Sequence, residues 1–277
     1  MTARRHTACL TGFSLLVLLG AGSATAEVDI SGTWIIAYHE DWIERGTGPD
    51  IAEYQGLPIN EAARQRALNW HPSLVNQPER QCMPLPLDYA VLWSNFRVWK
   101  EIDPKSQELV AYRFHREWQS MERTIWMDKR PHPPDYAPHT YQGFSTGEWE
   151  GDKLKVTTTH LKEGYSRRNG VPRSDKATIM EHYIRHGDYL TISRIVEDPV
   201  YLTEPLIHTS DYVASLTRPI NAYPCEIVTE LASMGKGYVP HYHFWKNPYL
   251  NEHAQKYGMS LEVAMGGAKQ MYPDFIE

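Results

Sequence analysis

Two neighbouring segments of the chain decide its fold: RTIWMDKRPHPP at residues 123–134 and GFSTGEWEGDKLKVTTTH at residues 143–160. Apolar residues recur at alternate positions in both segments, which is the pattern of half-buried β-strands. Some polar residues fall on the same alternating positions as the apolar ones. The two segments therefore predict strands of a β-barrel whose interior carries polar side chains.

The same alternation recurs along most of the chain. Short turns such as EGD at residues 150–152 and HGD at residues 186–188 indicate an antiparallel meander. Closure of the sheet removes its exposed edges, so we expect a mainly β protein with an antiparallel, lipocalin-like β-barrel. The expected strands cover residues 30–37, 92–102, 108–115, 121–128, 144–150, 153–160, 177–185, 189–197 and 203–213.

Two regions interrupt this pattern. Residues 41–86 are punctuated by Gly and Pro around one helical segment, residues 60–70, for which Asn60 is a suitable N-cap. The tail, residues 238–277, is rich in Tyr, His, Pro and Gly and has a short helical piece near residues 252–257. We expect a helical insertion and an irregular tail that packs on the barrel or makes a homo-oligomer.

Residues 1–26 have the three parts of a secretory signal peptide. Arg4 and Arg5 precede an apolar stretch, and Ala-Thr-Ala at residues 24–26 suits cleavage. The apolar stretch has about half of the roughly 20 residues that a membrane helix needs, and no later segment is longer. We expect one mature β domain, residues 27–277, in the periplasm or secreted, without stable membrane insertion.

Charge and cysteine content narrow the class further. The formal charge is −6, and loss of Arg4 and Arg5 would change it to −8. Such an acidic chain lacks the basic surface that nucleic-acid binding needs. Cys9 lies in the expected signal peptide, and an oxidising compartment favours a disulfide between the remaining Cys82 and Cys225 over two buried thiols.

Four expected strands each place one polar residue in phase with apolar ones: Arg123, His160, Glu181 and Arg194. Unpaired charges are costly inside a barrel, so the arginines and Glu181 are expected to pair, with His160 close enough to share hydrogen bonds. One interpretation is a structural ion pair that closes one end of the barrel. The other is a pocket where an arginine receives an anionic or phenolic oxygen and His160 and Glu181 move protons.

Two connections add candidate residues. The proline-rich loop at residues 128–139 contains His132, and rigid loops at a barrel mouth are favoured places for function, although such a loop also serves as plain surface structure. Tyr165 and Arg173 lie in the next long connection, for which one interpretation is a lid. We interpret Arg167 and Arg168 within it as solvated charges.

The sequence contains no cofactor motif that identifies a reaction. His241 and His243 form an HXH pair, but without a third ligand the segment PHYHFW is more typical of aromatic packing than of a metal site. The chain has no HEXXH and no glycine-rich phosphate loop. We therefore expect no cofactor and no metal.

Five segments together resemble a large family of exported bacterial proteins, largely of unknown function: CMP at 82–84, RTIWMDKRPHPP at 123–134, GEWEGDKLKV at 147–156, GVPRSD at 170–175 and EDPVYLTEPL at 197–206. The resemblance implies an exported, lipocalin-like barrel and supplies no reaction. The chain departs from the family pattern at three positions. Lys129 stands where glycine is typical, Lys155 where an aliphatic residue is typical, and Arg173 where histidine is common, which points to an anionic substrate if that histidine takes part in the family's chemistry.

Nine tryptophans and seventeen tyrosines suit a site for ring-bearing molecules, although they also build β cores. Our leading hypothesis is a cofactor-independent lyase, of the decarboxylase or dehydratase type, that acts on a small aromatic or hydrophobic molecule. Arg123, Arg194, Arg173 and His132 would bind the substrate, while His160, Glu181 and Tyr165 would carry the chemistry. The alternatives are a non-catalytic carrier of a hydrophobic ligand and an envelope protein whose barrel is filled.

Overall fold

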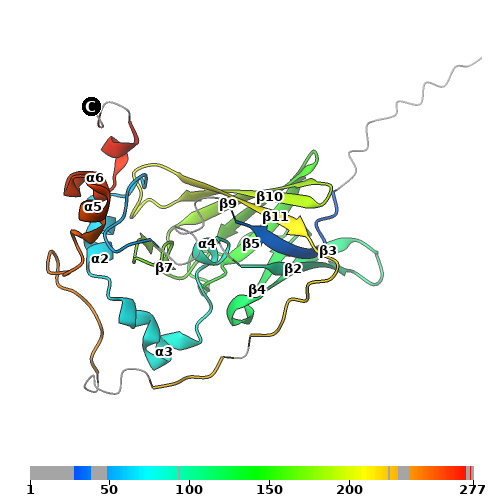
Figure 1. Ribbon diagram of the computed structural model, residues 1–277. Coiled ribbons are helices and arrows are strands. Elements are labelled where there is room, and N and C mark those ends of the chain that lie inside the picture. Colours follow the sequence, from blue (N-terminus) through cyan, green and yellow to red (C-terminus); the bar gives the residue numbers. More distant parts are fainter. Residues whose placement is uncertain are drawn as a thin grey trace, which may run out of the picture.

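The computed structural model describes residues 28–38, 49–92, 94–223, 225–229, 237–272 and 275. Within them, nine strands close into a barrel in the order β1-β11-β10-β9-β6-β5-β4-β3-β2 (Figure 1). The predicted mainly β, lipocalin-like barrel is confirmed, and the expected signal peptide lies outside the described residues. The strands are β1 (Gly32–Ala37), β2 (Phe96–Ile102), β3 (Leu109–Arg116), β4 (Glu122–Trp126), β5 (Phe144–Glu150), β6 (Lys153–Thr159), β9 (Thr178–His186), β10 (Tyr189–Glu197) and β11 (Leu206–Ala214).

The barrel is covered at one end, its mouth, by short helices and a small hairpin. The Asn60 side chain accepts a hydrogen bond from the Ala63 amide at 3.0 Å and caps the predicted helix of the insertion. The helices are α2 (Glu61–Leu68), α3 (Pro78–Gln81), α4 (Leu87–Ala90), α5 (Glu252–Tyr257) and α6 (Leu261–Ala264), the 3-10 turns are η1 (Pro72–Asn76), η2 (Trp118–Ser120) and η3 (Ala268–Met271), and β7 (Gly164–Tyr165) pairs with β8 (Pro172–Arg173).

The predicted antiparallel meander is wrong at one step. Strands β4 and β5 are parallel, with Ile125 opposite Ser145. Parallel neighbours need a long connection that returns the chain to the same end of the sheet. Residues 127–143 provide it, and the His132 side chain bonds Thr146 of β5 and Thr159 of β6, so the proline-rich loop crosses the outer face of these strands.

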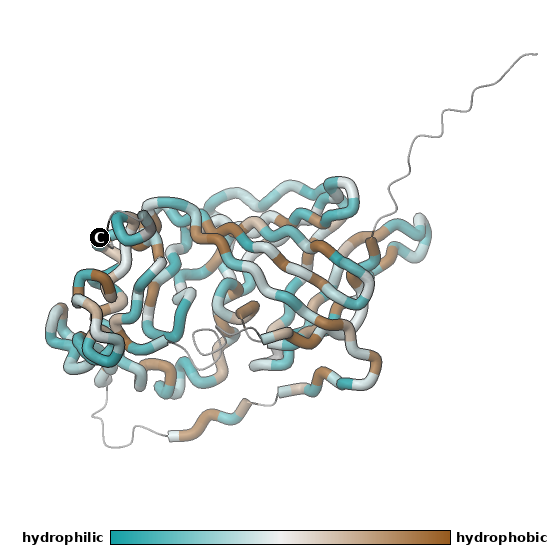
Figure 2. The backbone as a smooth tube through the Cα atoms, turned by 45° about the horizontal axis from the view of Figure 1, so that its top comes forward, coloured by the Kyte–Doolittle hydropathy of each residue, from teal (hydrophilic) through white to brown (hydrophobic). Residues whose placement is uncertain are grey.

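Two apolar clusters fill the molecule. Hydrophobic and hydrophilic positions alternate along the strands (Figure 2). Deep in the barrel, Phe114, Leu154 and Ile192 belong to one cluster. Nearer the mouth, the other cluster joins barrel residues such as Ile179 and Val196 to the helical insertion and the tail. Arg123, Glu181 and Arg194, three of the polar residues predicted to face inward, are buried in the barrel as well.

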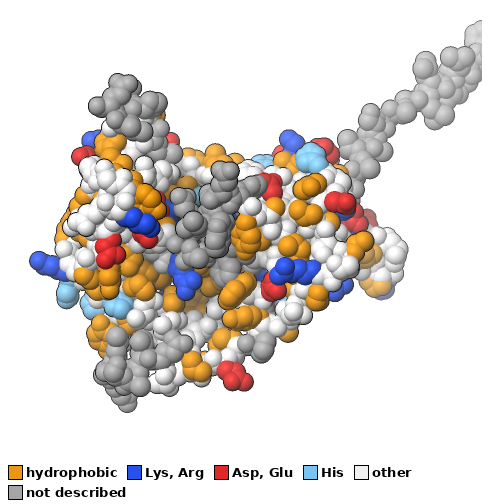
Figure 3. Space-filling model, viewed as in Figure 1, with side chains coloured by type: hydrophobic (Ala, Val, Ile, Leu, Met, Phe, Trp, Pro, Cys, Tyr) orange, Lys and Arg blue, Asp and Glu red, His pale blue; other side chains and the backbone are white. Residues whose placement is uncertain are grey.

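The C-terminal tail packs mainly on the helical insertion. The Tyr242 amide donates to the Asn69 carbonyl at 3.0 Å, and the Gly267 amide donates to the Leu57 carbonyl at 2.9 Å. Hydrophobic and histidine side chains lie side by side on the surface of this helical end (Figure 3). Whether the exposed aromatic residues of the tail join two copies of the chain stays a prediction.

The predicted disulfide is confirmed: Cys82, just after α3, is bonded to Cys225. It fastens residues 215–223 and 225–229, here called the strap, which run along the outside of the barrel (Figure 1). The Gln81 amide group donates to the Val228 carbonyl at 2.7 Å and accepts from the Val228 amide at 2.8 Å. Among the described residues, no helix has the length and apolar character needed to cross a membrane.

Candidate functional site at the barrel mouth

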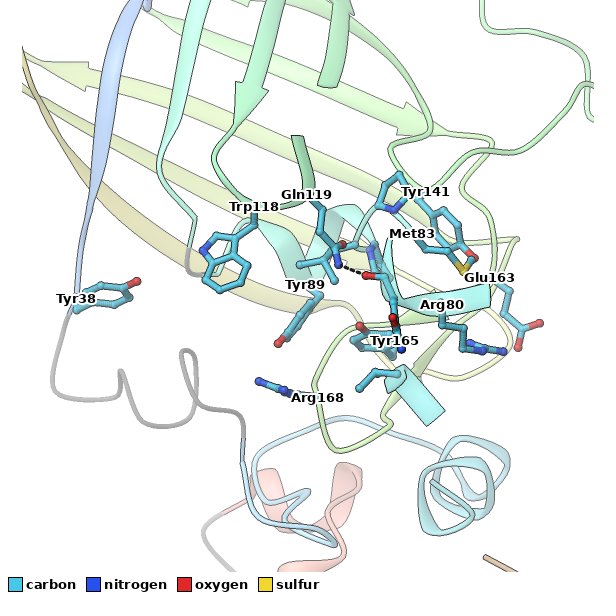
Figure 4. A pocket seen from close by; sticks show the side chains of 16 residues that line it. Tyr38, Arg80, Met83, Tyr89, Trp118, Gln119, Tyr141, Glu163, Tyr165 and Arg168 are labelled. Carbon is cyan, nitrogen blue, oxygen red and sulfur yellow. Dashed lines mark hydrogen bonds between the residues drawn. The ribbon is translucent and has the colours of Figure 1, made fainter. Parts of the chain in front are cut away.

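A cavity of about 560 Å³ lies at the mouth of the barrel. The ends of β1 and β3, the turns around α3 and α4, and the β7–β8 hairpin contribute its walls (Figure 4). Cavities of this size suit one small molecule, and aromatic walls suit a ring. Its aromatic lining consists of Tyr38, Tyr89, Trp118, Tyr141 and Tyr165.

The β7–β8 hairpin holds Tyr165 in the cavity wall. The Ser166 amide donates to the Val171 carbonyl at 2.9 Å and closes the hairpin. Gly170 has φ of 90°, and a Cβ there would lie 2.3 Å from the Trp70 Cβ, so only glycine allows this close approach. The Tyr165 ring packs 5.2 Å from Trp70 and 5.1 Å from Tyr89.

Two arginines give this aromatic cavity a positive character. Arg80 and Arg168 line it, and neither has an ion pair with a described residue. Figure 4 shows Arg168 and Arg80 on either side of Tyr165. Burial raises the pKa of Tyr165, and Tyr89 raises it further, whereas Arg168 and Arg80 act to lower it; the net shift is upward. Tyr165 is therefore a protonated phenol at neutral pH, beside two cations that can stabilise its anion.

The predicted buried ion pair is present inside the barrel. Glu181 is opposite Arg194 in the β9–β10 ladder. The Glu181 carboxylate lies 2.5 Å from Nη2 of Arg123 and 3.3 Å from Nε of Arg194. All three side chains are at most 2 % exposed. The sequence thus placed these three residues correctly on the inner face.

Arg123 is held by neutral partners as well. It donates to Ser145 Oγ at 3.1 Å, to the Tyr183 hydroxyl at 3.2 Å and to Thr158 Oγ1 at 2.8 Å. Burial alone would raise the pKa of Glu181, but Arg123 and Arg194 lower it overall. Burial and the Glu181 charge raise the pKa of Tyr183 to about 12. Glu181 is consequently a fixed anion between two cations, which is unsuitable for shuttling protons at neutral pH.

His160 does not join this group, contrary to the prediction. Strand β6 ends at Thr159, and His160 has φ of 55°, so the alternation of faces stops one residue earlier. Its Nε2 donates to the Pro134 carbonyl at 3.0 Å, and its Nδ1 lies 2.8 Å from Thr159 Oγ1. Of the four predicted inward groups, three converge and His160 fastens the proline-rich loop instead.

His132 lies in the same outer network. Its Nδ1 is 2.7 Å from Thr159 Oγ1 and its Nε2 is 2.8 Å from Thr146 Oγ1. Because the Pro134 carbonyl can only accept, a neutral network runs in one direction, from Thr146 through His132 and Thr159 to His160. Burial lowers the pKa of His132, and the nearby His160 lowers it further. His132 therefore anchors a loop to the outside of the barrel and does not line the mouth cavity.

Acidification should loosen this anchor. The folded state holds His132 neutral below its ordinary pKa of 6.5, so the unfolded state binds more protons there, and stability falls as pH drops below 6.5. We expect the difference in urea midpoint between the wild type and His132→Gln to shrink from pH 7.5 to pH 5.5. An unchanged difference over this range would contradict a neutral, network-bound His132.

Arg173 lies behind the cavity wall. It is 1 % exposed, its Nε donates to Asp88 Oδ1 at 3.1 Å, and its Nη1 donates to the Ser174 carbonyl at 3.0 Å. Gly164, which lines the cavity, separates it from that space, since a Cβ on Gly164 would lie 3.3 Å from Arg173 Nη2. Arg173 thus positions α4 and the hairpin and does not face a ligand in the mouth cavity.

Among the described residues, no group of three or more His, Cys, Asp or Glu side chains is arranged to hold a metal ion. His241 and His243 lie 5.2 Å apart ring to ring, and Nδ1 of His241 donates to the Val239 carbonyl at 2.7 Å.

Sequence reasoning missed most of the cavity lining. Tyr38, Trp118 and Arg168 come from strand ends and a loop, where no periodic pattern marks a direction. The prediction that Arg167 is a solvated charge is wrong, because its side chain is largely buried and is paired with Glu53 at 2.9 Å. Arg116 was also missed, although it is in phase with Tyr112 and Phe114 on β3 and that phase signals an inward side chain.

Comparison of the chain with models of known protein families finds no match, and comparison with curated proteins finds none either.

Proposed function

We propose that this protein binds a small aromatic molecule with an anionic group in the mouth cavity and acts on it as an exported, cofactor-independent lyase. The observation that carries the proposal is the Tyr165 phenol, which lies in an aromatic cavity between Arg80 and Arg168. No described residue hydrogen-bonds to its hydroxyl, so that group is available to a ligand. The cavity thus offers a ring platform, a positive anchor and a proton donor together.

The proposed chemistry needs only one proton carrier. In a dehydration, the Tyr165 hydroxyl protonates the leaving hydroxyl as its C–O bond breaks, and the tyrosinate then takes a proton from the adjacent carbon, which yields water and a double bond. In a decarboxylation, the electron pair of the broken C–C bond stays on carbon and accepts the Tyr165 proton, carbon dioxide leaves, and water reprotonates the tyrosinate. Arg168 would hold the anionic group and stabilise the tyrosinate in either case.

This assignment moves the reaction away from the predicted His160 and Glu181. Both are engaged elsewhere, His160 with the proline-rich loop and Glu181 with two arginines. Tyr165 is the predicted catalytic residue that lines the mouth cavity.

Tyr165→Phe should lower kcat by about 100-fold or more, because proton transfer by a positioned side chain contributes on the order of 10²–10⁴. Substrate affinity should change little, since the ring is retained. We would incubate the protein with aromatic acids, alcohols and aryl dimers and follow product mass. Tyr136→Phe is the matched control, because Tyr136 is 90 % exposed and outside the cavity.

Arg168→Met supplies a second readout. Loss of a charge-assisted hydrogen bond should weaken binding of a carboxylated ligand by roughly 10-fold or more and leave an uncharged analogue unaffected. For the Tyr165→Phe variant described above, unchanged turnover would show that Tyr165 takes no part in the mechanism.

A carrier is the second candidate. It is favoured by the location of the buried ionisable groups, since Glu181, Arg123 and Arg194 are outside the cavity lining and cannot reach a ligand there. Ligands that are retained with unchanged mass, with affinity reduced in Arg168→Met, would establish the carrier and exclude the lyase.

A further inference from the structure

Counted over the described residues, the barrel interior holds more positive than negative charge. Arg116, Arg123 and Arg194 are buried there around the single carboxylate of Glu181. Arg116 belongs to the same group, because it is two residues from Phe114 on the buried face of β3, and Phe114 is opposite Arg123 in the β3–β4 ladder. Its charge also contributes to lowering the pKa of both Glu181 and Tyr183. We call these four residues the arginine layer. Two of its positive charges therefore have no carboxylate of their own in the part of the chain that the structure describes.

Arg116 is the least satisfied member of the layer. Its Nη1 reaches Ser94 at 3.3 Å to the hydroxyl and 3.5 Å to the carbonyl, and its guanidinium lies 4.7 Å above the Phe96 ring. These are neutral partners. Its Nε and Nη2 groups are buried and have no hydrogen-bond acceptor among the described residues.

Arg194, on β10, also has buried N–H groups that lack a hydrogen-bond acceptor among the described residues. Its Nε reaches Glu181, but Nη1 and Nη2 are buried without an acceptor in the described part of the chain. Ser210 Oγ, on the neighbouring strand β11, is buried and unpaired as well. Buried N–H groups of a cation are costly to leave unpaired, and a protein of this size carries few of them.

We propose that the arginine layer is an internal anion site, in which Arg116 and Arg194 bind one or two small monovalent anions, either halide ions or the carboxylate of a compact acid. Such an ion would supply the missing acceptor and offset the surplus charge at once. The site is distinct from the mouth cavity, because none of the residues of the layer lines that cavity. The polar side chains of the barrel interior would then form a ligand-binding site and not only a structural ion pair.

The first test uses the wild-type protein. Crystals soaked in sodium bromide should show anomalous density beside the Arg116 and Arg194 guanidinium groups, and crystals soaked in formate should show a planar ion at the same place if carboxylates are the ligand. The two soaks separate the two sources of anion. Ordered water alone in both soaks would overturn the proposal.

The second test measures stability at constant ionic strength, with the bulky anion gluconate replaced stepwise by chloride or formate. A ligand at about 100 times its Kd should raise the thermal midpoint by about 5 °C or more for a domain of this size. Arg116→Met should abolish this rise. Arg113→Met is the matched control, because Arg113 is on the same strand but points outward to Glu101 at 2.5 Å, and it should keep the rise.

Arg116→Lys covers the case in which Arg116→Met does not fold. It keeps the charge and the stem but removes the planar set of donors, so the midpoint rise should be reduced by at least half. An equal rise in the wild type, Arg116→Lys and Arg113→Met would show a general salt effect and would overturn the site.

Discussion

Replacing Glu181 by Gln is expected to lower the free energy of unfolding by about 3–5 kcal/mol, because it leaves buried arginines without their carboxylate. The Glu181 side chain is fully buried and contacts both Arg123 and Arg194. Gln has nearly the same shape, so the loss would come from charge and not from a cavity. Urea unfolding at pH 7, followed by tryptophan fluorescence, gives the measurement.

Glu148→Gln is the matched control for this prediction. Glu148 pairs with Lys155 at 3.1 Å, but its side chain is 67 % exposed, so its replacement should change stability by less than about 0.5 kcal/mol. Replacing Arg123, Glu181 and Arg194 together with Met, Leu and Met should recover much of the loss, since well-packed apolar residues can substitute for buried ions. A Glu181→Gln protein as stable as the control would contradict the burial and pairing described above.

The pH dependence provides an independent check. The pKa of Glu181 in the folded protein lies below its ordinary value of 4.5. Its contribution to stability is therefore complete above about pH 4.5 and is lost as pH falls from there through the folded pKa. The stability gap between the wild type and Glu181→Gln should be constant from pH 8 to 5 and should narrow in more acidic solution.

Reduction of the Cys82–Cys225 disulfide is expected to lower stability by about 2–5 kcal/mol. The bond joins residues 143 positions apart, so it restrains a long loop in the unfolded chain. Urea midpoints with and without a thiol reductant measure the effect. The Cys82→Ala, Cys225→Ala double variant should unfold at the midpoint of the reduced protein and should not respond to the reductant.

The same bond should also influence the mouth cavity. Gln81 and Met83 flank Cys82 and line the cavity, while the strap brings Tyr223 to 5.1 Å from Trp118, another lining residue. Loss of the disulfide should therefore weaken ligand binding even where the fold survives. Unchanged ligand affinity in the double variant would show that α3 and η2 hold the cavity wall without the strap.

Sequence reasoning was reliable where side chains alternate over a long strand. Arg123, Glu181 and Arg194 are in mid-strand positions, and their inward direction follows from the apolar residues two positions away. It was wrong for His160 because the prediction extended β6 by one residue, and a single left-handed residue at that end redirects the chain. It was also wrong for the β4–β5 step, because a turn pattern does not reveal which end of the sheet a long loop returns to.

The sequence by itself determined a barrel and three of its inward charges, and it favoured a disulfide, because alternation, closure and cysteine count are local or additive properties of the chain. The tertiary structure alone decided which residues line the mouth cavity. Tyr38, Trp118, Arg168 and Tyr165 are far apart in sequence and meet only because the barrel mouth gathers strand ends and loops into one wall. Tertiary packing likewise brought Arg116 to the arginine layer and left it without a carboxylate partner among the described residues, since burial depends on every strand around it.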